Sequence, residues 1–289
     1  MHDVAEVRRF TRLVTQRVGA LNDHFLARDR PLGEARLLWE INEGADVRDL
    51  RARLDLDSGY LSRLLRSLES AGLVTVEAGE QDRRVRIARL TAKGRTERAI
   101  YDQRADDVAG SLLAPLNDKQ RAQLVNAMRE VDRLLTAGLV TVAPADPDHP
   151  HARHCLAAYF AELDHRFEQG FDAGKGISAE GDELRLPAGL LLVATLHDKP
   201  VGCGALKLAP DHAQIKRMWV ADEVRGLGIG RRLLAELEQH ARALGATTVR
   251  LETNKALAEA ITMYRANGYR EVEPFNDEYY AHHWFEKTL

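Results

Sequence analysis

The chain has 289 residues, of which 45% are hydrophobic and 29% are charged, and its formal net charge is −3. Because single domains usually hold roughly 100–150 residues, this length predicts two domains. No apolar run is long enough to span a bilayer, and the first residues lack the layout of a signal peptide. The two cysteines, Cys155 and Cys203, are expected to be small buried residues of a reduced cytoplasmic protein that does not contact a membrane.

Helical periodicity dominates the first half of the chain. Residues 33–43 and 46–54 are predicted as two short helices. A third helix is predicted from Asp57, a candidate N-cap, to Ala71. One face of this helix is apolar, with Leu61, Leu64, Leu65 and Leu68. The opposite face is small and basic and fits a major groove; it carries Gly59, Ser62, Arg63 and Arg66.

A predicted hairpin follows the third helix. Its strands are Leu73–Glu77 and Arg84–Leu90, and Arg83 and Arg84 lie at its tip. Residues 58–95 carry eight basic side chains against four acidic ones, an excess that can neutralise phosphates. Helices followed by a basic hairpin are typical of a winged helix-turn-helix, whose last helix reads bases and whose wing reaches phosphates or the minor groove.

One sequence pattern runs through Leu61–Val74, Asp82-Arg-Arg84 and Leu90-Thr-Ala-Lys-Gly94. This pattern resembles that of the MarR family, and the resemblance covers most of residues 5–138. It implies a homodimer, formed by first and last helices at about 5–27 and 96–136. It also implies contacts with double-stranded DNA from Ser58, Tyr60, Ser62, Arg63 and Arg66 in the major groove and from Arg83 or Arg84 in the minor groove. Asp82 would hold the wing, because a carboxylate is repelled by phosphate. The alternative is an ordinary solvated surface.

The segment 141–150 separates two strongly patterned regions. It contains three prolines and is therefore predicted to hold no regular ladder. We expect it to be a linker between a first domain at 1–140 and a second domain at 151–289.

In the second half, β-rich runs at 190–196, 201–208, 213–220 and 247–252 alternate with helices. The third of these runs leads through Arg225-Gly-Leu-Gly-Ile-Gly230 into an amphipathic helix over 231–244. Glycines let the backbone approach a pyrophosphate, and the free N–H groups and dipole of the helix favour its charge. A dinucleotide-binding Rossmann motif is the alternative, but the loop comes too late to leave room for a second βαβ half.

Two features belong together here: the spacing Arg225-x-x-Gly228-x-Gly230 and the later stretch Glu259–Tyr269. In both, the chain resembles the GNAT family of N-acetyltransferases. The resemblance implies an α/β domain with a mixed, mostly antiparallel central sheet and acetyl-CoA as cosubstrate. It implies Tyr264 as the general acid for the leaving thiolate, for which a buried helix aromatic is the alternative. The implied coenzyme contacts are Met218, Trp219, Val220, Arg225, Gly226, Leu227, Gly228, Ile229, Gly230, Arg231 and Asn254.

Two positions depart from the GNAT pattern. Many relatives have a glutamate base on the strand before the glycine loop, where this chain has Lys216. The base is therefore unassigned, and a water chain is expected in its place. The position seven residues before Tyr264, often asparagine in the family, is Leu257, and Asn254 at the end of the preceding strand is the candidate to replace it.

Residues 151–186 are expected to form the first helices and the acceptor-side loop. Acidic and aromatic side chains there would suit a cationic amine, although charged helix surfaces are common. The candidate acceptor contacts are Tyr159, Glu162, Arg166 and Phe167, with Phe160, Asp164 and Phe171 nearby. No metal is expected at His149, His151 and His154, because no carboxylate or thiolate is fixed beside them.

These observations predict a MarR-like, mainly α winged-helix domain followed by a GNAT-like α/β domain. The predicted function is a DNA-binding transcriptional regulator that also transfers an acetyl group from acetyl-CoA to an amine, either a small molecule or a protein lysine. Two alternatives stay open. The second domain would be a non-catalytic acyl-CoA sensor, or the first domain would serve only as a dimerisation scaffold.

Overall fold

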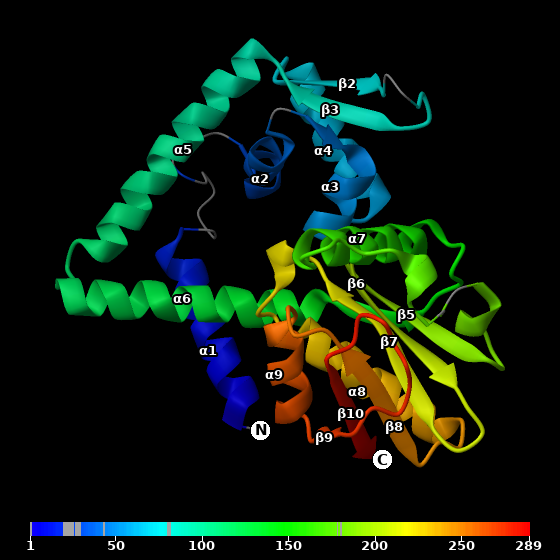
Figure 1. Ribbon diagram of the computed structural model, residues 1–289. Coiled ribbons are helices and arrows are strands. Elements are labelled where there is room, and N and C mark those ends of the chain that lie inside the picture. The colour runs from blue at the N-terminus through cyan, green and yellow to red at the C-terminus, as the bar shows by residue number, and fades with distance from the viewer. Residues whose placement is uncertain are drawn as a thin grey trace. The chain divides into compact units, whose positions relative to one another are not determined.

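A computed structural model describes residues 2–19, 26, 30–42, 44–79, 82–177, 179 and 181–289 (Figure 1). The chain forms two compact units, Met1–Arg129 and Glu130–Leu289. The division falls inside a long helix and not at the predicted linker. In the part of the chain that the structure describes, no helix combines the length and the apolar character needed to cross a membrane.

The first unit contains the predicted helices and hairpin. Its elements are α1 (His2–Arg17), α2 (Leu32–Ile41), β1 (Ala45–Asp46), α3 (Val47–Leu54), α4 (Ser58–Ser70), β2 (Val74–Ala78), β3 (Arg86–Leu90), α5 (Ala92–Leu113) and the first part of α6 (Asp118–Leu139). The three strands form an antiparallel sheet in the order β1-β3-β2. The prediction of a mainly helical, winged arrangement is confirmed.

The leucine face of α4 forms the centre of the first unit. Leu61, Leu64, Leu65 and Leu68 are buried against α2 and the hairpin. Asp57 caps this helix as predicted, because its carboxylate accepts the backbone N–H of Tyr60 at 2.9 Å. The buried face fixes the rotation of α4, so its basic face points to solvent.

The predicted helices at the two ends of the first domain differ from the structure. The stretch at about 96–136 is divided into α5 and α6 by residues 114–117, where Pro115 removes a backbone donor and clashes with the preceding turn. Asn117 and Gln120 then exchange backbone-to-side-chain hydrogen bonds at 2.9 and 3.0 Å, which starts the second helix. The helix predicted at about 5–27 ends at Arg17, and most of its remaining residues lie outside the described ones.

The second unit is built on a seven-stranded sheet. Its elements are β4 (Thr141–Pro144), α7 (Pro150–Arg166), η2 (Ala173–Lys175), η3 (Gly181–Leu184), β5 (Gly189–Leu196), β6 (Lys199–Leu208), β7 (Ala213–Val220), η4 (Asp222–Val224), α8 (Ile229–Ala243), β8 (Thr248–Thr253), α9 (Ala258–Ala266), β9 (Arg270–Val272) and β10 (His283–Thr288). The strand order is β4-β5-β6-β7-β8-β10-β9, and among the described strands β7 and β8 alone pair in parallel. The predicted mixed, mostly antiparallel sheet is confirmed.

Helices cover both faces of this sheet. Along β5, Leu190, Leu192 and Ala194 pack into the cluster that contains the buried leucines of α8. The alternate residues Leu191 and Val193 pack into the cluster that contains Ala152 and Cys155 of α7. Because successive side chains of a strand point to opposite faces, a strand covered on both sides is apolar throughout.

The segment predicted as a linker is part of the second unit. Thr141–Pro144 forms the edge strand β4, which pairs with β5 from Thr141 opposite Thr195 to Pro144 opposite Leu192. An edge strand tolerates proline because one row of its backbone groups faces away from the sheet. His149 then caps α7, and Pro150 occupies its first turn, where no N–H is required. The prediction that these prolines exclude a regular ladder is therefore wrong.

Gly94 allows α5 to approach the hairpin closely. A Cβ atom at this position would lie 2.0 Å from the carbonyl oxygen of Leu73, so Gly94→Ala requires the backbone to move. We expect this change to lower the free energy of unfolding of the first unit by about 1–3 kcal/mol. Gly110→Ala on the same helix is the matched control, since a Cβ there meets no described residue outside its own helix within 4 Å, and it should stabilise the unit by about 0.5–1 kcal/mol.

The two variants are compared by thermal unfolding of the full chain, with amide hydrogen exchange to assign the transition to the first unit. Equal unfolding temperatures for Gly94→Ala and Gly110→Ala would contradict the close approach of α5 and the hairpin.

Candidate functional site

Strands β7 and β8 separate after a short parallel pairing. They are joined in register only at Ala213 opposite Val249 and at Gln214 opposite Arg250. Farther along β7, the register with β6 shifts between Cys203 and Ala205, and Arg217 takes a φ of 57°. This bulge turns the rest of β7 away from β8. Two cavities lie along the part of the sheet where the strands have separated.

The loop after β7 and η4 has the geometry of an anion site. Gly226 and Gly228 have φ values of 83° and 82°, a region that side chains disfavour. Gly228 is the N-cap of the 15-residue helix α8, and no side chain caps that end. The first-turn N–H groups and the positive end of the helix dipole therefore favour a bound anion.

We call the first cavity the glycine-loop cavity. It is lined by Tyr159, Glu162, Leu163, Arg166, Met218, Trp219, Val220, Val224, Arg225, Gly226, Gly228, Ile229, Gly230, Arg231, Leu257, Glu259, Ala260, Met263 and Tyr264. Nine of the eleven residues predicted to contact coenzyme are in this set. Leu227 and Asn254 are not. Both amide atoms of Asn254 are engaged elsewhere, with the carbonyl of Tyr280 at 2.7 Å and the N–H of Ala256 at 2.9 Å.

Glu162 on α7 binds three hydrogen-bond donors at the glycine-loop cavity. Its carboxylate accepts hydrogen bonds from Arg225 at 2.6 Å, from the indole of Trp219 at 3.0 Å and from Arg166 at 3.1 Å. Burial raises the pKa of Glu162, but the hydrogen bonds from Arg225 and Arg166 outweigh burial and lower it overall. Glu162 and Arg166 were predicted to lie on the acceptor side, whereas the structure places them at the glycine-loop cavity, because α7 crosses both cavities.

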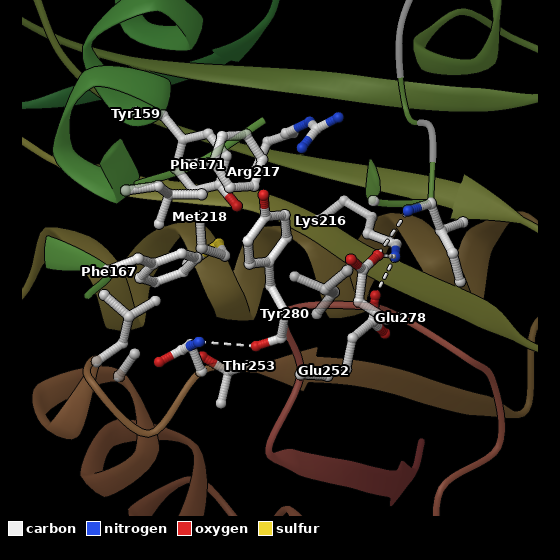
Figure 2. A pocket seen from close by; sticks show the side chains of 18 of the residues that line it. Tyr159, Phe167, Phe171, Lys216, Arg217, Met218, Glu252, Thr253, Glu278 and Tyr280 are labelled. Carbon is white, nitrogen blue, oxygen red and sulfur yellow. Dashed lines mark hydrogen bonds and ion pairs between the residues drawn. The ribbon is translucent and has the colours of Figure 1, made fainter. Parts of the chain in front are cut away.

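We call the second cavity the aromatic cavity (Figure 2). It is lined by Tyr159, Leu163, Phe167, Phe171, Ala173, Gly176, Ile177, Ile215, Lys216, Arg217, Met218, Glu252, Thr253, Asn254, Leu257, Ala260, Tyr264, Glu278, Tyr280 and Ala281. Tyr159 and Phe167, both predicted as acceptor contacts, are in this set.

One end of the aromatic cavity is charged. The ammonium of Lys216 donates to Glu252 of β8 and lies 4.0 Å from Glu278, which belongs to the loop before β10. Figure 2 shows the three side chains converging. In the sequence, Lys216 stands out only as a departure from the family pattern, and neither glutamate stands out at all. They lie 36 and 62 residues from Lys216 along the chain, and no local motif marks them.

Tyr264 of α9 lies where the two cavities meet, because it lines both of them. It is 5% exposed, and its ring packs 5.8 Å from Tyr269 and 6.0 Å from Phe285. Burial, with smaller contributions from Tyr159 and Glu252, raises the pKa of Tyr264. Its hydroxyl is therefore protonated at neutral pH.

In the first unit, all residues predicted to contact DNA are exposed. They are Ser58, Tyr60, Ser62, Arg63 and Arg66 on α4 and Arg83 and Arg84 at the turn of the hairpin. The guanidinium of Arg63 lies 5.6 Å from the centre of the Tyr60 ring. Asp82 accepts the backbone N–H of Arg84 at 2.8 Å, so it orders the wing through the main chain.

Comparisons with known proteins match both halves of the chain. The Acetyltransferase (GNAT) family matches residues 154–269, and the MarR family matches residues 29–85. An IAA acetyltransferase from Azospirillum brasilense is 33% identical over 138 residues, which are 47% of this chain and 88% of that protein. An acetyltransferase of the GNAT family from Staphylococcus aureus, solved as a crystal structure, aligns with a TM-score of 0.45 and 18% identity over 52% of this chain and 99% of its own.

The first half is similar to known regulators. An organic hydroperoxide resistance transcriptional regulator from Bacillus subtilis is 36% identical over 77 residues, which are 27% of this chain and 49% of that protein. The chain therefore spans about half the length of this regulator. The chain belongs to the GNAT acetyltransferase family, and a MarR family segment precedes its acetyltransferase domain.

Proposed function

We propose that the chain is a bifunctional regulator and enzyme. Its second unit transfers an acetyl group from acetyl-CoA to an amine by direct attack on the thioester, and its first unit binds double-stranded DNA as a homodimer. The single observation that carries the enzymatic part is the position of Tyr264, which lines both cavities. One cavity suits the coenzyme, the other suits the acceptor, and a proton donor lies between them.

The glycine-loop cavity fits the coenzyme. The uncapped start of α8 and the left-handed Gly226 and Gly228 offer backbone N–H groups to a pyrophosphate. Arg231 adds a cation at the same cavity. Acetyl-CoA supplies the activated thioester, and the N–H groups of Met218–Val220, freed by the separation of β7 from β8, would polarise its carbonyl.

Tyr264 would protonate the departing thiolate. Its raised pKa keeps the phenol protonated at neutral pH. A thiolate in the same buried surroundings is also destabilised, because removal from water disfavours the charged form of each group. Proton transfer from the phenol therefore accompanies cleavage of the carbon–sulfur bond.

The first unit has surfaces suited to DNA and to a second subunit. The exposed basic face of α4 and the arginines of the wing would contact the major groove and the minor groove. Helix α1 carries a solvent-exposed apolar stripe with Val4, Val7 and Phe10 at a spacing of three residues, exposed by 64%, 64% and 48%. An amphipathic helix that exposes such a stripe is stabilised by a partner helix, which supports a homodimer formed through this unit.

A second candidate is a regulator whose GNAT domain senses acyl-CoA without turnover. The observation that favours it is Lys216, a cation on the strand where many GNAT enzymes carry a glutamate base. In that case the glycine-loop cavity would still bind the coenzyme, but no amine would be acetylated.

Removal of the Tyr264 hydroxyl tests catalysis. We expect Tyr264→Phe to lower kcat by about 100-fold or more, because a proton donor is lost, while acetyl-CoA binding measured by calorimetry is retained. Tyr269→Phe is the matched control: this neighbouring tyrosine is 3% exposed and lines neither cavity, so its turnover should equal that of the wild type. Release of free thiol in a screen of small amines, amino acids and lysine-rich peptides is the readout.

Two results would contradict this proposal in different ways. Full turnover by Tyr264→Phe would remove the tyrosine from the mechanism. Acetyl-CoA binding without turnover by any of the three proteins would favour the sensor.

Substitution of surface arginines tests the DNA-binding half. Arg63→Ala and Arg84→Ala should each weaken binding to the protein's own promoter fragment by about tenfold and reduce the slope of log affinity against log salt by about one. Lys119→Ala, an exposed cation at the start of α6, is the control and should bind as the wild type does. If neither the wild type nor the variants shift the fragment, the first unit is a dimerisation scaffold.

A further inference from the structure

The charged end of the aromatic cavity has one more negative than positive group. The side chains of Glu252, Lys216 and Glu278 are 5%, 8% and 13% exposed. Two carboxylates share one ammonium there, which leaves a formal excess of one negative charge in a buried place. A buried charge is costly unless a partner neutralises it.

The neighbouring cation Arg217 is occupied elsewhere. Its guanidinium carbon lies 4.7 Å from the centre of the Phe160 ring and 5.7 Å from that of Tyr159. Its Nε atom donates to the carbonyl of Ala179 at 3.4 Å. The guanidinium is therefore held by the aromatic rings of α7 and by Ala179, so the excess charge at Glu252 and Glu278 is left for a ligand.

The two glutamates differ in how their oxygens are used. Glu278 accepts the backbone N–H of Ile177 at 2.7 Å through the same oxygen that faces Lys216. Glu252 binds Lys216 through Oε1, while its Oε2 atom is buried and has no hydrogen-bond partner among the described residues. A buried carboxylate oxygen without a donor is rare and costs stability. A donor from a ligand in the cavity would satisfy it.

Several aromatic rings also line this cavity. Tyr280 lies 4.9 Å from Phe171 and 5.4 Å from Phe167, measured between ring centres, and Tyr159 lines the same cavity. Aromatic faces bind flat apolar groups and attract cations. A molecule with an aromatic body and a positive head would place both parts in matching surroundings.

We infer that the aromatic cavity binds a primary arylalkylamine and that Glu252 is the catalytic carboxylate that receives its ammonium group. With the ammonium of the ligand bound, the net charge of Glu252, Glu278, Lys216 and the ligand would be zero. Glu278 is a positioning residue, since it faces the ammonium of Lys216, whereas Lys216 competes with the ligand for Glu252. A glutamate on β8 thus takes the place of the base that many relatives carry on the strand before the glycine loop. The transfer step rests on the function proposed above, whereas the binding step does not.

The proton and electron changes balance without a further reactant. The ammonium gives one proton to Glu252, and the freed nitrogen lone pair forms a bond to the thioester carbon. The carbon–sulfur bond breaks, and the thiolate takes a proton from Tyr264. The second proton that the nitrogen loses returns to Tyr264 through water, and Glu252 releases its proton to solvent.

Calorimetry tests the inference with the full chain saturated with coenzyme A, so no turnover is needed. The probes are 2-phenylethylamine and phenylacetate, which share an aromatic ring and carry opposite charges. We expect the amine to bind and phenylacetate not to bind. Glu252→Gln should weaken amine binding by about tenfold or more, because a charge-assisted hydrogen bond is lost. The matched control Glu278→Gln should weaken it clearly less, and unchanged coenzyme A affinity shows that both variants are folded.

Lys216→Met provides a second test, in which the affinity for the amine is expected to rise and not to fall. It removes the competing cation, so amine binding should become tighter by several-fold. Phenylacetate binding as tight as that of the amine, no amine binding by the wild type, or equal amine binding by Glu252→Gln and wild type would each overturn the inference. Amine binding without acetylation would contradict only the proposed enzyme activity, and acetylation of another acceptor without amine binding would contradict only the inference.

Discussion

The separation of β7 from β8 is the constraint on which the second unit depends. Parallel strands normally continue their ladder, but these two are in register at only two positions before the bulge at Arg217 redirects β7. Beyond the pairing with β8, residues 215–220 of β7 line the two cavities. The apolar clusters on both faces of β5 and β6 stabilise the sheet, although β7 and β8 are separated at its centre.

The separation also explains why one helix, α7, contributes to both cavities. Its Glu162 and Arg166 line the glycine-loop cavity, whereas Phe167 at its end lines the aromatic cavity. Tyr159 and Tyr264 line both cavities, so the site is continuous from the glycine loop to the charged end. A thioester at the meeting point would lie beside a proton donor and beside the acceptor.

Local sequence signals predicted the elements well and the charged groups poorly. Apolar periodicity and the Asp57 cap predicted α4, and the glycine spacing predicted the start of α8, because these features act over a few residues. Prolines misled the interpretation of Thr141–Pro144, since the effect of a proline depends on whether its strand is at an edge. Glu252 and Glu278 meet Lys216 only through the strand order, which no local pattern encodes.

The most direct test of the account is a calorimetric titration of acetyl-CoA into the full chain. The uncapped start of α8, the left-handed glycines and the separated strands predict saturable binding at one site per chain. The absence of saturable binding would contradict the assignment of the glycine-loop cavity to the coenzyme, and with it both the enzyme and the sensor.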